Sequence, residues 1–152
     1  MKWAVFSRRE MSRYAWQKHD ETSIVISINS SCDLFLEIPR NSKNGIKRLL
    51  SLSFDDVDKE QYDEMTEDGY GSVVLMDEQD AARIVAFVKK YKDSVDGIIV
   101  HCDAGVSRSA GVMAAIMKWL TGDDSKIFSD LRFHPNMWCY CLVLNEFMKE
   151  GK

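Results

Sequence analysis

The sequence predicts an α/β fold in which a central, mainly parallel twisted sheet of four to five strands is flanked by helices. Short β-branched apolar runs alternate along the chain with longer segments whose apolar residues recur at helical spacing. The chain has 152 residues, of which 45% are hydrophobic, 29% are charged and two are prolines. This length suits one globular domain and is too short for two ordinary ones. We therefore expect residues 1–152 to form a single domain.

Strand and helix signals alternate in the first third of the chain. Trp3 to Phe6 predicts a short strand, and Ser7 to Glu10 has the S-x-x-E form of a capping box that opens a helix toward Lys18. Ile24 to Ile28 is β-branched and apolar enough for a buried strand. Lys47 to Phe54 predicts a further strand that leads into an acidic loop.

The acidic loop is predicted to span Asp55 to Gly71 and to separate the third strand from the next helix. Asp77 or a neighbour can cap that helix. Its apolar residues keep the i, i+3, i+4, i+7 spacing of a stripe that faces a core: Ile84, Phe87, Val88 and Tyr91.

A strongly apolar helix follows the fourth predicted strand, Ile98 to Val100. It is expected to span about Ser107 to Leu120, with Lys118 as its only charged residue beyond the first turn. Such a helix is buried nearly all round. Thr121 and Gly122 should end it.

Two more helices are expected before the end of the chain. Asp123 to Leu131 should hold a short one, and the last helix follows Pro135. Apolar residues of the last helix stand at helical spacing: Met137, Cys141, Leu144 and Met148. In sheets of this kind the active site lies at the carboxyl ends of the strands.

Composition excludes several classes of partner and site. Twenty Lys and Arg against 24 Asp and Glu give a net charge of -4, so we expect neither a nucleic-acid partner nor membrane attraction. No apolar run is long enough to cross a bilayer, and the first ten residues lack a secretory signal, which predicts a cytoplasmic protein. The four cysteines have the spacing of neither a disulfide framework nor a zinc site, so we expect reduced thiols and no metal.

The residues that carry chemistry lie in the turn between the fourth strand and the apolar helix. There, five residues separate Cys102 from Arg108, enough to wrap backbone N–H groups around a tetrahedral oxyanion, and glycine allows backbone angles closed to other residues. The N-terminal end of the helix adds a partial positive charge, so inorganic phosphate or sulfate would also fit. The anion-binding residues are predicted to be Asp103, Ala104, Gly105, Val106, Ser107 and Arg108.

Each reactive side chain in this turn has a predicted task. Cys102 is the nucleophile, because a helix N-terminus and nearby cations lower a cysteine pKa from its usual value of about 8.5. Arg108 presents a planar fork for two phosphate oxygens, which lysine would replace poorly. Ser109 is placed to donate a hydrogen bond to the sulfur and help the thiolate depart. His101 is expected to order the loop and not to act as a base.

The motif H-C-x-A-G-x-S-R-S, His101 to Ser109, resembles the signature of the cysteine-based protein tyrosine phosphatases, particularly their dual-specificity branch. The resemblance implies the cysteine-phosphatase fold and hydrolysis of a phosphomonoester through a phosphocysteine intermediate. It also implies no cofactor, and a phosphorylated protein or a small phosphomonoester as substrate. The order of elements agrees over roughly Ser23 to Lys149, whereas residue-level matching is confined to His101 to Ala110.

The resemblance also implies a general acid on a loop upstream of the nucleophile. Phe54-Asp55-Asp56 is similar to the Trp-Pro-Asp of that loop, and Asp56 stands in the place of the aspartate. Asp55 and Asp58 are adjacent alternatives, and Asp68 is a distant one. Asp56 and Cys102 are 46 positions apart, more than the resemblance suggests, and the extra length is expected to be a surface excursion, Lys59 to Gly71, over the site.

Two alternatives stay open at this point. One is a phosphatase for a non-protein phosphate ester, although the variable loop positions Asp103, Val106 and Ser107 lack the positive charge that a polyphosphorylated ligand needs. The other is a catalytically weak module that binds phosphate without turnover. His19 and His134 are expected to be surface or packing residues. The sequence does not decide between phosphotyrosine and phosphoserine substrates.

Overall fold

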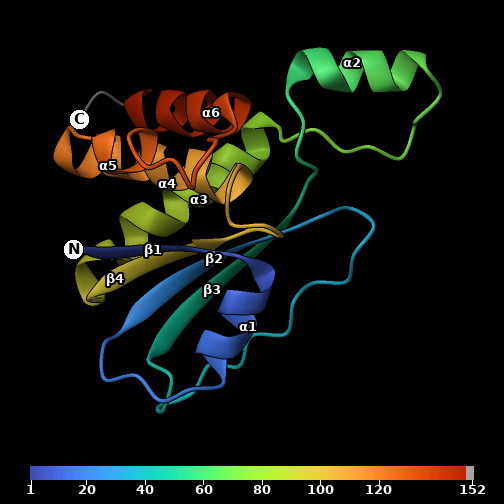
Figure 1. The fold of residues 1–152 in the computed structure, drawn as a ribbon. Coiled ribbons are helices and arrows are strands. Elements are labelled where there is room, and N and C mark those ends of the chain that lie inside the picture. Colours follow the sequence, from blue (N-terminus) through green and yellow to red (C-terminus); the bar gives the residue numbers. More distant parts are fainter. Residues whose placement is uncertain (150–152) are drawn as a thin grey trace.

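The computed structural model describes residues 1–149 and contains one parallel sheet of four strands. The strands are β1 (Lys2–Phe6), β2 (Ser23–Asn29), β3 (Ile46–Ser53) and β4 (Gly97–His101). They lie side by side in the order β1-β4-β2-β3, and every neighbouring pair is parallel (Figure 1). The predicted α/β fold with a parallel sheet is thereby confirmed.

Helices cover both faces of this sheet (Figure 1). The helices are α1 (Arg8–Ala15), α2 (Lys59–Glu67), α3 (Glu78–Tyr91), α4 (Arg108–Thr121), α5 (Ser125–Phe128) and α6 (Met137–Met148). A short 3-10 turn, Lys92–Ser94, follows α3. Helix α1 packs on one face, α3 and α4 pack on the other, and α6 packs against α3 and α4. No helix among residues 1–149 is long and apolar enough to cross a membrane.

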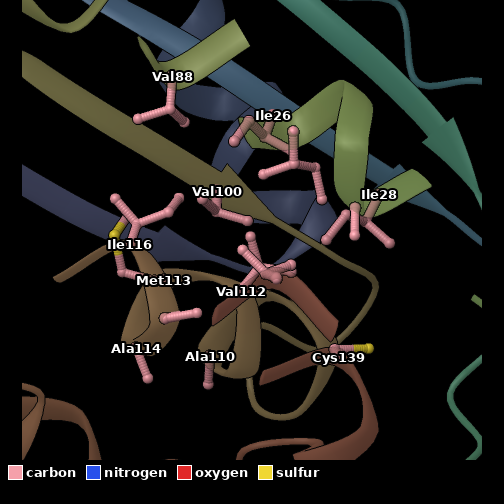
Figure 2. Close-up of a cluster of buried hydrophobic side chains, with 14 of the residues drawn as sticks. Ile26, Ile28, Val88, Val100, Ala110, Val112, Met113, Ala114, Ile116 and Cys139 are labelled. Carbon is pink, nitrogen blue, oxygen red and sulfur yellow. The ribbon is translucent and has the colours of Figure 1, made fainter. Parts of the chain in front are cut away.

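The larger core lies between the sheet and α4. Ile26, Ile28 and Val100 of the strands point toward Val112 and Ile116 of that helix in Figure 2. Ten consecutive residues of α4, 108–117, are buried, which confirms the expected burial all round. Because most of these residues are apolar, their burial drives the docking of α4 onto the sheet.

Glycine residues are needed near both ends of α4. At Gly111 an added Cβ would lie 2.5 Å from the carbonyl oxygen of Asn136, so a glycine is needed where α4 approaches the start of α6. Gly122 takes a left-handed conformation with φ of 78° and ends α4, as the sequence predicts.

The other face of the sheet carries a smaller core under α1. It consists of Met11, Ala15, Val25, Ile38, Ile46 and Ile99. Ile38 comes from the long segment after β2 and brings that segment down onto the sheet. The segment thus borders the carboxyl edge of the sheet while remaining without helix or strand.

Two predicted boundaries differ from the structure. Helix α1 ends at Ala15 and does not reach Lys18, because the carbonyl of Tyr14 accepts hydrogen bonds from the backbone of Gln17 and from the ring of His19. The predicted acidic loop contains helix α2, which Asp58 caps. Its residues favour helices individually but form no apolar stripe, so periodicity did not indicate it.

The buried face of α6 also differs from the residues singled out in the sequence. Cys139, Val143 and Phe147 are buried, whereas Met137 and Met148 are exposed. Apolar residues occur all round this helix, so spacing alone fits more than one face. Contact with α4 and α3 decides which face is inside.

Candidate active site

The loop between β4 and α4 is held against the start of the chain. The backbone N–H of Cys102 donates to Phe6 O at 3.3 Å, and that of Arg8 donates to Asp103 O at 3.0 Å. Gly105 has a φ of 70°, and an added Cβ would lie 2.5 Å from Ser7 N. The loop therefore requires glycine at this position both for its backbone angle and for its contact with the β1–α1 turn.

Cys102 lies buried at the N-terminal end of α4. Its Sγ is 3.0 Å from Ser109 Oγ, and both side chains are almost inaccessible. The described cysteines are all free thiols. Cys139 is also buried and lies in the first turn of α6, and burial raises the pKa of its thiol far above the usual value. Of the two buried thiols in residues 1–149, Cys102 is the one with a hydroxyl beside its sulfur.

Arg108 crosses the base of the loop in a fixed orientation. Its Nη1 donates to Phe54 O at 2.7 Å and to Ser30 Oγ at 3.1 Å, and its Nη2 donates to Asp103 Oδ2 at 3.2 Å. The Nε is buried and has no hydrogen-bond partner within the described chain. An unpartnered buried N–H is costly unless a ligand supplies an acceptor.

Asp103 binds the arginine with its side chain, a contact that the sequence did not indicate. Its Oδ2 accepts hydrogen bonds from Ser30 and Arg108, while its Oδ1 is buried without a partner in residues 1–149. Burial opposes ionisation of Asp103, but the Ser30 hydroxyl and the charge of Arg108 outweigh it and lower the pKa of this carboxyl. Ser30 follows β2 directly. Its position at the carboxyl edge of the sheet is the sequence feature that could have indicated that Ser30 belongs to the site.

His101 supports the loop from beneath. Its Nε2 lies 2.6 Å from Ser27 Oγ and its Nδ1 lies 3.3 Å from Cys102 O. Burial lowers the pKa of His101 to about 4, so the ring is neutral at pH 7. These contacts agree with the expectation that it orders the loop.

Asp56 is the upstream carboxylate that touches the anion-binding loop. Its Oδ1 accepts hydrogen bonds from Ser107 Oγ at 2.7 Å and from Asn136 Nδ2 at 3.0 Å. Val57 O accepts a second hydrogen bond from the same amide, at 3.3 Å. Asn136 thus joins the segment after β3 to the start of α6.

The alternative acids have structural partners elsewhere. Asp55 accepts hydrogen bonds from the N–H and hydroxyl of Ser31 and from the N–H of Val74. Burial opposes its ionisation, but these hydrogen bonds prevail and lower the pKa of Asp55. Asp58 caps α2, and Asp68 follows the last turn of that helix. Among the four candidates, Asp56 is the one in contact with the loop.

The remaining loop residues form the rim of the site. Ala104 is exposed, and Val106 and Ser107 are half-buried. Val106 O accepts the N–H of His134 at 3.0 Å, and Ser107 O accepts the N–H of Asn136 at 2.9 Å. Beside this rim lies an open cleft of about 300 Å³, whose lining includes Asp56, Ser107, Asn136 and Trp138.

The whole arrangement matches solved structures over most of the chain. Human DUSP28 aligns with a TM-score of 0.58 and 15% identity, covering 98% of this chain and 93% of that one. The chain has the tyrosine phosphatase fold. PTPMT1 in complex with PI(5)P gives a TM-score of 0.53 and 19% identity, covering 93% of this chain and 85% of the other. Tk-PTP in the active form gives 0.52 and 14%, covering 95% and 88%.

These neighbours with the tyrosine phosphatase fold are cysteine-based dual-specificity phosphatases. At such low identity the likeness fixes the fold and leaves the roles of individual residues to their geometry. No family model and no curated protein matches this chain. Within residues 1–149, no group of three or more His, Cys, Asp or Glu side chains is arranged to hold a metal ion.

Proposed function

We propose that this chain is a cysteine-dependent phosphomonoester hydrolase, with residues 1–152 as one catalytic domain. The observation that carries the proposal is the buried pair on one loop: the Cys102 thiol beside Ser109, and an Arg108 guanidinium whose Nε lacks a partner in the described chain. A phosphoryl group in the loop supplies that partner and faces the sulfur. The tyrosine phosphatase fold supports the same reaction.

In the first step the Cys102 thiolate attacks the phosphorus. An S–P bond forms as the bond from phosphorus to the leaving oxygen breaks. The leaving oxygen takes a proton from the carboxylic acid of Asp56. Arg108 and the N–H groups of residues 103–108 stabilise the charge that shifts onto the equatorial oxygens.

In the second step water breaks the S–P bond. Asp56, now a carboxylate, takes a proton from that water, whose oxygen bonds to phosphorus and releases inorganic phosphate. The Ser109 hydroxyl donates a hydrogen bond to the departing Cys102 thiolate. His101 stays neutral and holds the Cys102 carbonyl throughout.

We propose a phosphorylated protein as substrate, with phosphotyrosine-type esters preferred. Free thiols support a reducing, cytoplasmic setting. The PTPMT1 neighbour is complexed with PI(5)P, which makes a phosphate ester of a lipid the second candidate. A catalytically weak phosphate-binding module is the third, and Asp103 favours it, because its carboxylate competes with phosphate for Arg108.

Hydrolysis of an aryl phosphate, a phosphotyrosine peptide and a phosphoserine peptide between about pH 4 and 9 tests the proposal. Turnover of the aryl ester by wild type and its loss in Cys102→Ser support a cysteine phosphatase. Cys32→Ser is the matched control, since Cys32 is an exposed thiol. Tight binding of phosphotyrosine or vanadate without turnover would assign the chain to the binding modules instead.

A further inference from the structure

A basic hollow runs from the anion-binding loop along α1. Its volume is about 810 Å³, and it is open to solvent. Three arginines, Arg8, Arg9 and Arg13, line it together with Trp16, and Asp103 of the loop closes its near end. The hollow therefore borders the proposed phosphate site at Asp103.

The three arginines make no ion pair within residues 1–149, and Asp103 is the single carboxylate among the lining residues. Arg8 donates to neutral acceptors, Asn29 Oδ1 at 2.8 Å and Leu34 O at 2.9 Å. Arg9 and Arg13 are exposed and make no salt bridge in the described chain. The chain as a whole carries a net charge of -4, so this patch is opposite in sign to the molecule.

We propose that this hollow binds acidic residues of a phosphoprotein next to the phosphorylated residue. The inference rests on the proposed function, because the phosphorylated side chain would occupy the adjoining loop. Arg9 and Arg13 are one helical turn apart, about 6 Å along the axis. An extended peptide places every second side chain on the same side at a spacing of about 6.6 Å, so two alternate acidic residues match the two arginines.

The net charge favours a peptide over an anionic membrane, because the acidic chain as a whole is repelled by an anionic lipid surface. Trp16, at the far end of α1 and 67% exposed, adds an aromatic surface for the peptide beyond its acidic residues.

The test compares phosphotyrosine peptides that differ only in two alternate positions, Asp in one and Asn in the other. One series places these positions before the phosphotyrosine and a second series places them after it. Affinity is measured on Cys102→Ser protein, so that it does not depend on turnover. The same background then carries Arg9→Gln/Arg13→Gln or, as a control of equal charge change, Lys118→Gln/Lys126→Gln. These two lysines are exposed and lie on α4 and α5, away from the face of the sheet that α1 covers.

In one of the two series, the acidic peptide is expected to bind about threefold to tenfold tighter than its Asn partner at low salt. The preference should vanish in Arg9→Gln/Arg13→Gln, persist in Lys118→Gln/Lys126→Gln, and weaken strongly at high salt. Equal binding in both series, no peptide binding, or a preference that survives the arginine changes would overturn the inference.

Two further measurements distinguish a lipid ligand from a peptide, and peptide binding from catalysis. Binding of vesicles that contain a phosphoinositide, lost on Arg9→Gln/Arg13→Gln and without any peptide preference, would assign the hollow to a lipid and overturn the peptide proposal. Hydrolysis of an aryl phosphate by the wild type is scored separately. If that hydrolysis is absent while the arginine-dependent peptide preference is present, the proposed phosphatase function is wrong and the proposed peptide binding in the hollow is supported.

Discussion

The two segments that build the site differ sharply in how they are held. The loop after β4 lies between the sheet and α4, and its key side chains, His101, Cys102, Arg108 and Ser109, are all buried. The segment between β3 and α3 extends away from the body and carries α2, a helix without a single buried residue (Figure 1). Nevertheless Asp56 of the second segment meets Ser107 of the first.

We call the loop after β4 the fixed part of the site and the segment between β3 and α3 the attached part. Two adjacent residues hold the attached part in place: Asp55 accepts hydrogen bonds from Ser31 and Val74, and Asp56 accepts them from Ser107 and Asn136. Segments with few buried apolar contacts open locally at low free-energy cost, and α2 has no buried residue. We therefore expect α2 to open locally while the nucleophile and arginine keep their geometry, and Asp56 to stay near the loop because its neighbours Phe54 and Val57 are buried.

The largest predicted effect on kcat distinguishes Asp56 from Asp55. Asp56→Asn should lower kcat about 10²- to 10⁴-fold for an aryl ester with a poor leaving group, because that group needs a proton. Asp55→Asn should cost less than about tenfold, since it loosens an anchor and leaves the acid in place. Steady-state kinetics on phenyl phosphate checks both changes. A larger loss in Asp55→Asn would exchange the two roles.

The fixed part of the site depends on a planar guanidinium. Arg108→Lys should lower kcat/KM by about 10²- to 10³-fold, because an ammonium cannot reproduce the contacts of Nη1, Nη2 and Nε together. Arg132→Lys, on an exposed arginine paired with Asp130, is the control and should have little effect. Retention of most of the activity in Arg108→Lys would mean that the charge alone is sufficient.

Burial of His101 makes the fixed part sensitive to mild acid. The pKa of His101 is lowered from 6.5 to about 4 in the folded protein, so the unfolded chain binds the proton first as pH falls. Stability from the neutral ring is complete above pH 6.5 and is lost progressively down to about pH 4. Between pH 7.5 and 5 we expect wild type to lose about 2 kcal/mol of unfolding free energy.

Urea unfolding at the two pH values measures this loss. His101→Gln should be less stable at pH 7.5 but should lack that pH dependence, whereas His134→Gln, on an exposed ring, should retain it. An unfolding free energy that is the same at both pH values in wild type would show that His101 is hydrated in solution.

The smallest predicted effect is on the unfolding free energy, and it compares the N-terminal caps of α3 and α2. Asp77 caps α3 and Asp58 caps α2, each through a capping box. Asp77→Ala should lower the unfolding free energy by about 1 kcal/mol. Asp58→Ala should change it by less than about 0.3 kcal/mol, because α2 can unfold without disturbing a core. Equal losses in urea unfolding would mean that α2 is coupled to the fold.

The sequence predicted the fixed part much better than the attached part. Strands β2 and β4 and helix α4 are buried, so their apolar runs indicated both type and place, and the turn from Cys102 to Arg108 followed from them. Helix α2 buries nothing, so no hydrophobic pattern distinguished it from a loop. The buried face of α6 was not readable either, because contact with α3 and α4 selects it.

Contacts between distant segments account for what the sequence left open in the site. Asp56 was chosen by its similarity to a family loop, yet its neighbours Ser107 and Asn136 depend on how the excursion returns to the body. The contact of Asp103 with Arg108 depends on a side-chain orientation that spacing does not specify. Ser30 enters only because β2 and β4 are adjacent and parallel.

The most direct test of the account is to trap the covalent intermediate. Ser109→Ala should slow the release of the Cys102 thiolate, so acid quenching during turnover of an aryl phosphate should reveal a phosphoryl group on the Cys102 peptide by mass spectrometry. Cys102→Ser under the same conditions should carry none and release no phenol. Turnover of the ester with no phosphoryl group on Cys102, or with the group on another residue, would contradict the proposed mechanism.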